Sequence, residues 1–223
     1  SDTSWIADVV AGGEVLLNRA VDIKGKSVAL SPLTAFDKQA IKFACDNGCK
    51  RVYASFISSA DDVSFVKSLL SSNVQIVSKI ETAKGVANAL EIIEQSDAVL
   101  IDRGDLSREI TIASVPMAVR SIVELAVSRS CPVYIATNVL DSMMSSQLPS
   151  RAEISDIYTL LNCGVTGIVL AAEVAIGDNP VSSTALLEYL MRLYRNHRFG
   201  LHGMGFIDKP DRALIGDQLF NWL

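Results

Sequence analysis

The feature that most constrains the fold of this chain is a regular alternation between short β-branched runs and longer amphipathic stretches. Five runs have the length and composition of strands: 51–57, 74–80, 97–102, 132–136 and 166–171. Six stretches carry apolar residues at helical spacing: 35–47, 61–71, 83–95, 113–130, 151–163 and 180–197. Strands that alternate with helices predict an α/β fold with a parallel sheet and right-handed crossovers. Both a doubly wound sheet and a partial or truncated (β/α)8 barrel fit this order.

Composition and length favour one domain with two appendages. Apolar residues make up 49% of the 223 residues, which excludes disorder and favours strands that are buried on both faces. We expect a β-rich lead-in over 1–33, a body of βα repeats over 34–198 and a tail over 199–223. The tail ends in an apolar segment that must be buried, either on the body or on a partner.

Charge and cysteine usage exclude several kinds of partner. A net charge of −5 with no cluster of Lys and Arg disfavours nucleic acid and anionic membranes. The longest apolar runs, such as 165–172, are far shorter than the roughly 20 residues that a membrane-spanning helix needs. The four cysteines contain no C-x-x-C pair, as is typical of buried thiols in a reducing compartment. We therefore expect an intracellular protein, in the cytoplasm or in the stroma or matrix of an organelle.

Polar groups follow four successive predicted strands at the point where each strand ends. They are Lys79 and Glu81, Arg103 and Asp105, Thr137, and Glu173. In parallel α/β folds the carboxyl ends of the strands meet at one rim, where ligands bind. The sequence therefore predicts a site at this rim.

The residue types at the rim indicate a divalent metal. Lys79 and Glu81 point to the same side of their strand, because side chains alternate along it. Glu81 and Asp105 come from neighbouring strands and can flank a hard cation such as Mg2+ or Mn2+. Such an ion stabilises an enolate, and Lys79 beside it can hold a phosphoryl group. The pattern indicates enolate or phosphoryl-transfer chemistry.

Structural roles are open alternatives for several of these residues. Lys79 and Glu81 could form an exposed ion pair, Asp105 could stabilise a turn, and Thr137 could cap the next helix. For Glu153 the structural role is preferred, because S-x-x-E at 150–153 matches a capping box.

Five ordered motifs resemble those of the pyruvate kinase family. They are S-K-I-E (78–81), R-G-D-L (103–106), A-T-x-x-L-x-S-M (136–143), S-R-A-E-x-S-D (150–156) and G-D-N-P (177–180). The resemblance covers roughly residues 10 to 195 and corresponds to the second half of that family's catalytic barrel. It implies a TIM (β/α)8 architecture, of which this chain holds a part.

The resemblance also implies a function and a role for each site residue. The family transfers a phosphoryl group from phosphoenolpyruvate to ADP through the enolate of pyruvate. By resemblance, Lys79 contacts the phosphoryl group, and Glu81 and Asp105 ligate Mg2+ or Mn2+. The Gly104 backbone faces the substrate carboxylate, and Thr137 lies beside the enolate carbon.

The chain also departs from the family pattern. Three barrel strands that carry a phosphate-binding arginine and a monovalent cation site have no counterpart here, so the monovalent site is expected to be lost. Asp102 stands where the family has a small residue, and Ser107 stands for a glycine. Val174 and Ile176 replace a threonine and a lysine. Asp102 adds negative charge where an anionic substrate should bind.

Three functions fit this combination. The chain could be part of a pyruvate kinase-type phosphotransferase, active once another chain, a second copy or a segment of the protein outside this sequence covers the open barrel. It could be an inactive relative that serves as a scaffold, with its apolar tail docked on a partner. It could also be a metal-dependent lyase or aldolase that acts on a pyruvate-like enolate.

Overall fold

The computed structural model describes residues 8–10, 12–14, 17, 33–198 and 211–222. Its centre is one parallel sheet in which each strand pairs with its neighbour in sequence. The strands are β1 (Arg51–Ala54), β2 (Gln75–Ile80), β3 (Ala98–Asp102), β4 (Val133–Ala136) and β5 (Gly167–Val169). A doubly wound sheet reverses direction at a switch point, and this order does not reverse. The α/β class with the winding of a partial (β/α)8 barrel is therefore confirmed.

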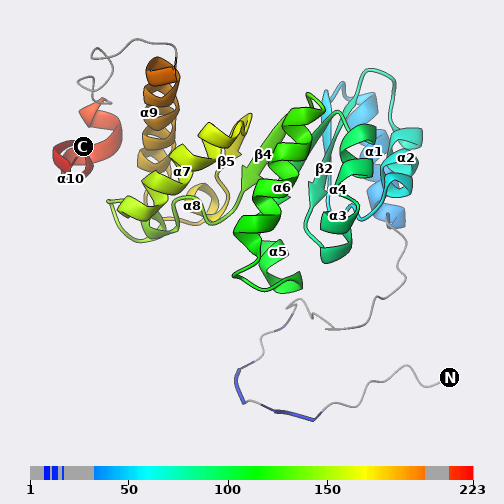
Figure 1. Cartoon of the computed structure of the whole chain (residues 1–223), viewed down its shortest axis with the longest axis horizontal. Coiled ribbons are helices and arrows are strands. Elements are labelled where there is room, and N and C mark those ends of the chain that lie inside the picture. Colours follow the sequence, from blue (N-terminus) through cyan, green and yellow to red (C-terminus); the bar gives the residue numbers. More distant parts are fainter. Residues whose placement is uncertain (1–7, 11, 15–16, 18–32, 199–210, 223) are drawn as a thin grey trace.

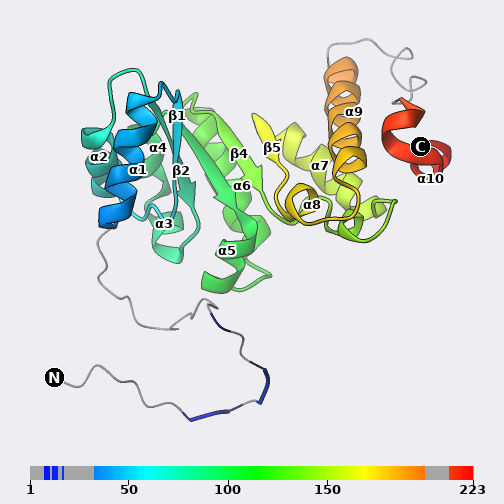
Figure 2. The same ribbon diagram turned by 180° about the vertical axis from the view of Figure 1, so that it is seen from behind.

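Helices follow the strands and cover one face of the sheet. They are α1 (Ala35–Asp46), α2 (Ala60–Leu69), α3 (Ala83–Ala87), α4 (Ala89–Gln95), α5 (Arg103–Glu109), α6 (Val115–Ser128), the 3-10 turn η1 (Asp141–Met144), α7 (Arg151–Cys163), α8 (Ala172–Ala175), α9 (Pro180–Arg198) and α10 (Arg212–Trp222). Helices α2, α4 and α6 pack side by side on the sheet (Figures 1 and 2). Among the described helices, none is both long and apolar enough to cross a membrane.

The strands divide their side chains between two apolar layers. Ile76 and Ile80 of β2 face the helices, together with Ile101 of β3, and all three are fully buried. Val77 and Leu100 face the other side, in a small cluster that Ala98 and Ala136 complete. Because side chains alternate, this second side continues into Lys79, Glu81 and Asp102 at the carboxyl ends of β2 and β3. The polar site therefore belongs to the side that is the interior of a barrel.

The end of the tail packs on the body of the same chain. Helix α10 contacts α9, and Ile215 and Leu219 are buried in a cluster with Leu186 and Leu187 of α9. Figures 1 and 2 show both helices at the β5 end of the molecule, far from β1. Of the two places expected for the apolar tail, the structure shows the body. The β-rich lead-in expected over 1–33 lies almost wholly outside the described residues.

Two predicted elements have the wrong extent. The strand expected over 51–57 ends at Ala54, because Phe56 has a left-handed backbone (φ 56°) and gives its N–H to Glu81 instead of to a strand. The helix expected over 83–95 is two helices, since Asn88 leaves helical geometry and its side chain donates to the Ser58 carbonyl (2.8 Å). The hydrophobic periodicity of the sequence could not predict either of these long-range hydrogen bonds.

Helix α7 begins with the capping box that the sequence predicted. The Ser150 side chain accepts from the Glu153 N–H, and Glu153 accepts from the Ser150 N–H (2.6 Å). Glu153 also accepts from the backbone N–H of Ser142 (2.8 Å), so it ties η1 to α7. Burial raises the pKa of Glu153, but the hydrogen bonds from Ser142 and Ser150 outweigh this and lower it below 4.5.

Replacing Glu153 with Ala is expected to destabilise the chain by about 1–2 kcal/mol, because α7 loses half of its cap. Urea unfolding at neutral pH measures this difference. The matched control is Glu188→Ala on the exposed face of α9, which should be nearly neutral. Equal loss in the two variants would contradict the capping role. Since the pKa of Glu153 is lowered on folding, its contribution is present above pH 4.5 and disappears as the pH falls.

Candidate metal and substrate site

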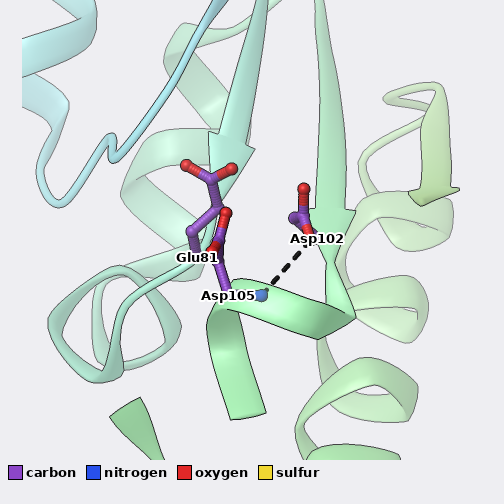
Figure 3. Close-up of side chains that lie close together, drawn as sticks. All are labelled: Glu81, Asp102 and Asp105. Carbon is purple, nitrogen blue, oxygen red and sulfur yellow. Dashed lines mark hydrogen bonds between the residues drawn. The ribbon is translucent and has the colours of Figure 1, made fainter. Parts of the chain in front are cut away.

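Three carboxylates converge at the carboxyl ends of β2 and β3. Glu81 follows β2, Asp102 ends β3 and Asp105 lies in the first turn of α5. One oxygen from each lies within 4.8 Å of the others (Figure 3). Carboxylate oxygens at this spacing are the ligands that Mg2+ and Mn2+ prefer. Glu81 and Asp105, the two residues predicted as metal ligands, are therefore brought together, and Asp102 joins them.

Glu81 is fully buried, and both of its carboxylate oxygens have a partner. The residue is 0% exposed, and its Oε2 accepts from the Phe56 N–H (2.6 Å). Its Oε1 is paired with the Lys79 ammonium, which lies against it. Such full burial excludes the exposed ion pair that the sequence left open. A buried carboxylate at this rim, beside those of Asp102 and Asp105, fits a ligand for a divalent cation.

Lys79 places its charge between two of the carboxylates. Its Nζ contacts Glu81, lies 3.4 Å from Oδ2 of Asp102 and reaches Oγ of Ser55 at 3.5 Å. Partial burial lowers the pKa of Lys79, but the hydrogen bond and charge of Glu81 and the charge of Asp102 outweigh it, so the pKa is raised above 10.5. The ammonium stays protonated at neutral pH and can pair with an anion.

Asp102 and Thr137 form a hydrogen-bonded corner beside the carboxylates. Oδ1 of Asp102 accepts from the N–H of Asp105 (3.3 Å) and lies 2.9 Å from the Thr137 hydroxyl, whose single proton it shares with the Ala136 carbonyl (2.6 Å). The Gly104 N–H donates to Oγ1 of Thr137 (2.7 Å). A side chain at 104 would meet that oxygen, because a Cβ there would lie 3.2 Å from it. The structure therefore joins the predicted residues 104 and 137 through one hydrogen bond.

Thr137 has an unusual backbone that Arg103 supports. Thr137 and Asn138 both have left-handed φ angles, 66° and 53°, which are uncommon for a β-branched residue such as threonine. Arg103 donates from Nε to the Thr137 carbonyl (3.2 Å) and from Nη2 to the Asn138 carbonyl (2.6 Å). Its Nη1 pairs with Asp156 of α7 (2.6 Å). Thr137 is thus held in a loop and does not cap the helix that follows it, although its Oγ1 accepts from Gly104 in the first turn of α5.

Glu173 lies apart from the carboxylate cluster and joins two loops. It is 1% exposed and accepts from the N–H groups of Val139 (3.2 Å), Leu140 (3.1 Å) and Ala171 (2.8 Å). Burial raises its pKa, but the backbone hydrogen bonds outweigh this and lower it below 4.5. The buried carboxylate therefore stays ionised and fixes the loop after β4 to the loop after β5.

Of the other residues that depart from the family pattern, Ser107 is hydrogen-bonded within α5, whereas Val174 and Ile176 are exposed. The Ser107 hydroxyl donates to the Gly104 carbonyl within α5 (2.7 Å). Val174 and Ile176 are exposed, at 43% and 76%.

Sequence reasoning placed Arg103 at the rim and Asp102 where the substrate should bind. It missed that Asp102 joins the carboxylate cluster and that Arg103 supports the loop at Thr137. Their position directly at the end of a predicted strand was the signal that could have revealed both roles.

A sequential parallel sheet with a carboxylate and lysine cluster at the carboxyl ends of its strands defines a barrel-type domain with a candidate metal site at its rim. Residues 2–184 match the family model described as pyruvate kinase, barrel domain. The chain belongs to the pyruvate kinase family.

Curated relatives agree with this family. The chain is 36% identical to the pyruvate kinase of Sporosarcina psychrophila over 81% of its own length and 31% of that protein. It is 32% identical to a pyruvate kinase of Agrobacterium vitis, over 88% of this chain and 41% of the relative. It is 35% identical to the chloroplastic pyruvate kinase isozyme G of Ricinus communis, over 80% and 44%. The chain thus spans less than half the length of these relatives.

Proposed function

We propose that this chain carries the metal-binding and enolate-binding side of a pyruvate kinase-type active site. In this proposal it transfers a phosphoryl group from phosphoenolpyruvate to ADP once the remaining barrel strands are supplied. The observation that carries the proposal is the approach of the Glu81, Asp102 and Asp105 oxygens to within 4.8 Å, beside the charged Lys79. Family membership supports the reaction class.

Each predicted site residue has a place in this proposal. Glu81 and Asp105 would hold Mg2+ or Mn2+, and the bound ion would supply Lewis acidity at the enolate oxygen. The Lys79 ammonium would contact the phosphoryl group, because it is protonated and sits at the same rim. The Gly104 N–H and the Thr137 hydroxyl, hydrogen-bonded to each other here, would turn to the substrate carboxylate and the enolate.

Asp105→Asn is expected to weaken Mn2+ binding by roughly tenfold or more, because it removes one ionised ligand. Titration with Mn2+, followed by the electron paramagnetic resonance signal of the free ion, measures the affinity directly. The matched control is Asp61→Asn, an exposed residue in the first turn of α2. If Asp105→Asn binds Mn2+ as tightly as the control does, the metal site is placed wrongly.

The unpaired edges of the sheet are evidence that further strands complete the barrel. Within the described residues, β1 pairs only with β2, and β5 pairs only with β4, so two edges have unpaired backbone groups. We propose that the missing strands come from another chain, from a second copy or from a part of the protein outside this sequence. The four free thiols support a reducing, intracellular setting. Coupled detection of pyruvate, with and without the upstream barrel strands of a relative, tests the reaction.

A non-catalytic relative is the second candidate. The observation in its favour is that the Asp102 carboxylate lies in hydrogen-bond distance of the Thr137 hydroxyl (2.9 Å), a donor that the first proposal assigns to the substrate. Metal binding would persist in such a relative, but the reaction would not. Absence of pyruvate formation with the upstream strands present, in a chain that still binds Mn2+, would favour this candidate.

A further inference from the structure

A cavity of about 510 Å³ lies between α7 and α9. Figures 1 and 2 show these two helices beside β5, and they contact each other. The volume is in the range of small-molecule sites, roughly 300–1,000 Å³. We propose that this α7–α9 cavity binds a small apolar molecule with one anionic head group, such as a medium-chain monocarboxylate. None of the residues that line it belongs to the metal site, so this inference does not depend on the proposed function.

The lining of the α7–α9 cavity is mainly apolar. Ile157 and Leu161 of α7 are buried in the core cluster that also holds α9 and α10. Leu190 and Leu193 of α9 also line the cavity, and both are partly buried against the same cluster. A ligand that covers these side chains gains about 25 cal/mol for each Å² of apolar surface that it removes from water. The lining therefore favours an apolar ligand body.

Three rings form an aromatic part of the same lining. The Tyr158 and Tyr194 rings meet edge to face with their centroids 5.7 Å apart, and the His197 ring lies 6.5 Å from that of Tyr158. Tyr158 is 46% exposed, although its neighbour Ile157 is fully buried. Aromatic side chains offer a large and rigid apolar surface to a ligand. The exposed part of Tyr158 is surface that a ligand in the cavity can cover.

The charge of the lining favours an anionic head group. Arg151 lines the cavity, whereas none of the described residues that line it is acidic. The two carboxylates nearest to Arg151 on α7 are engaged elsewhere: Glu153 accepts from Ser142, and Asp156 pairs with Arg103. Within the part of the chain that the structure describes, the Arg151 guanidinium has no ion-pair partner. It is therefore available to a carboxylate.

The extent of the cavity favours a small molecule over a protein partner. Its lining comes from about three turns of α7, residues 151–161, and about two turns of α9, residues 190–197. A stable protein–protein interface buries roughly 1,200–2,000 Å² in total, which needs a much wider surface. The occupant that fits this space is a short alkyl chain or a single ring with its head group at Arg151.

Calorimetric titration of the whole chain with octanoate, 1-octanol and octylammonium tests the choice of head group, because the three probes share one alkyl chain. All are used below the concentrations at which they aggregate. Octanoate is expected to bind at a single site, about fivefold more tightly than octanol, as an exposed ion pair with Arg151 would give. Octylammonium is expected to bind more weakly than octanol, since its charge has the same sign as that of Arg151.

Two substitutions test whether the probe lies in the cavity. Arg151→Gln leaves the capping box of Ser150 and Glu153 in place, so octanoate should bind only as tightly as octanol while octanol binds as before. Ser155→Phe adds a ring to the cavity from an exposed position, so both probes should bind about tenfold more weakly. The matched control is Arg120→Gln on the exposed face of α6, which should change nothing. Thermal unfolding shows that each variant is folded.

Several results would overturn the inference. They are absence of octanoate binding to the unmodified chain, equal affinity for octanol or octylammonium, and unchanged octanoate binding in Ser155→Phe. An equal effect of Arg151→Gln and Arg120→Gln would show that net charge attracts the probe, and not the cavity. Sedimentation analysis tests the other occupant: if the unmodified chain is a dimer that Ser155→Phe dissociates, the cavity is an interface between two copies, and the inference is wrong.

Discussion

Glu173→Gln is expected to lower the free energy of unfolding by about 3 kcal/mol. A glutamine offers one oxygen where the carboxylate offers two, so its NH2 group must face either the Ala171 N–H or those of Val139 and Leu140. At least one buried amide then loses its acceptor, and the remaining hydrogen bonds lose the negative charge. Urea unfolding of the unmodified chain and of Glu173→Gln, fitted with one common m-value, measures the difference in the free energy of unfolding.

The control for Glu173 is Glu188→Gln, the same substitution on an exposed position of α9, which should change stability by less than about 0.5 kcal/mol. Acid titration adds an independent check. Because folding lowers the pKa of Glu173, its stabilisation is complete above 4.5 and is lost as the pH falls through the lower value of the folded state. The gap between the two proteins should therefore narrow in acid, and a constant gap would mean that the charge contributes nothing.

Glu81→Gln is expected to weaken Mn2+ binding by roughly 100-fold, more than loss of a supporting residue usually does. Glu81 is the fully buried member of the cluster, and its Oε1 is paired with the Lys79 ammonium. Glutamine keeps the size of the side chain and can still accept from the Phe56 N–H through its carbonyl oxygen. Calorimetric titration with Mn2+, or the resonance signal of the free ion, gives the affinity.

The matched control for Glu81 is Glu109→Gln, on the exposed end of α5 and close to the site in sequence. It should bind Mn2+ as the unmodified chain does. Equal Mn2+ affinities in Glu81→Gln and Glu109→Gln would show that Glu81 is not a metal ligand. Loss of affinity together with loss of cooperative unfolding would instead show that Glu81 serves the loop at Phe56, so thermal unfolding of both variants belongs to the experiment.

Much of the fold was predictable because it depends on local pattern. All five predicted strands and all six predicted helical regions exist. They were predictable because the buried face of a helix or strand fixes the spacing of its apolar residues. The alternation of side chains along 78–81 also predicted that Lys79 and Glu81 lie on one side of their strand. Asp105 was predicted beside them because functional residues gather at the carboxyl ends of parallel strands. The errors fall at Phe56 and Asn88, where a hydrogen bond from a distant segment overrides the local preference.

Order in sequence determined the βα alternation, the parallel sheet and the rim on which the acidic and basic groups gather, because each of these follows from spacing along a strand or helix. Tertiary structure decided what those groups do. Thr137 meets Asp102 across 35 residues, and Glu173 binds the amide of Val139 across 34. Only the folded sheet brings such partners within hydrogen-bond distance. The hydrogen bonds at Asp102 and at Glu173 therefore could not be predicted from the order of residues.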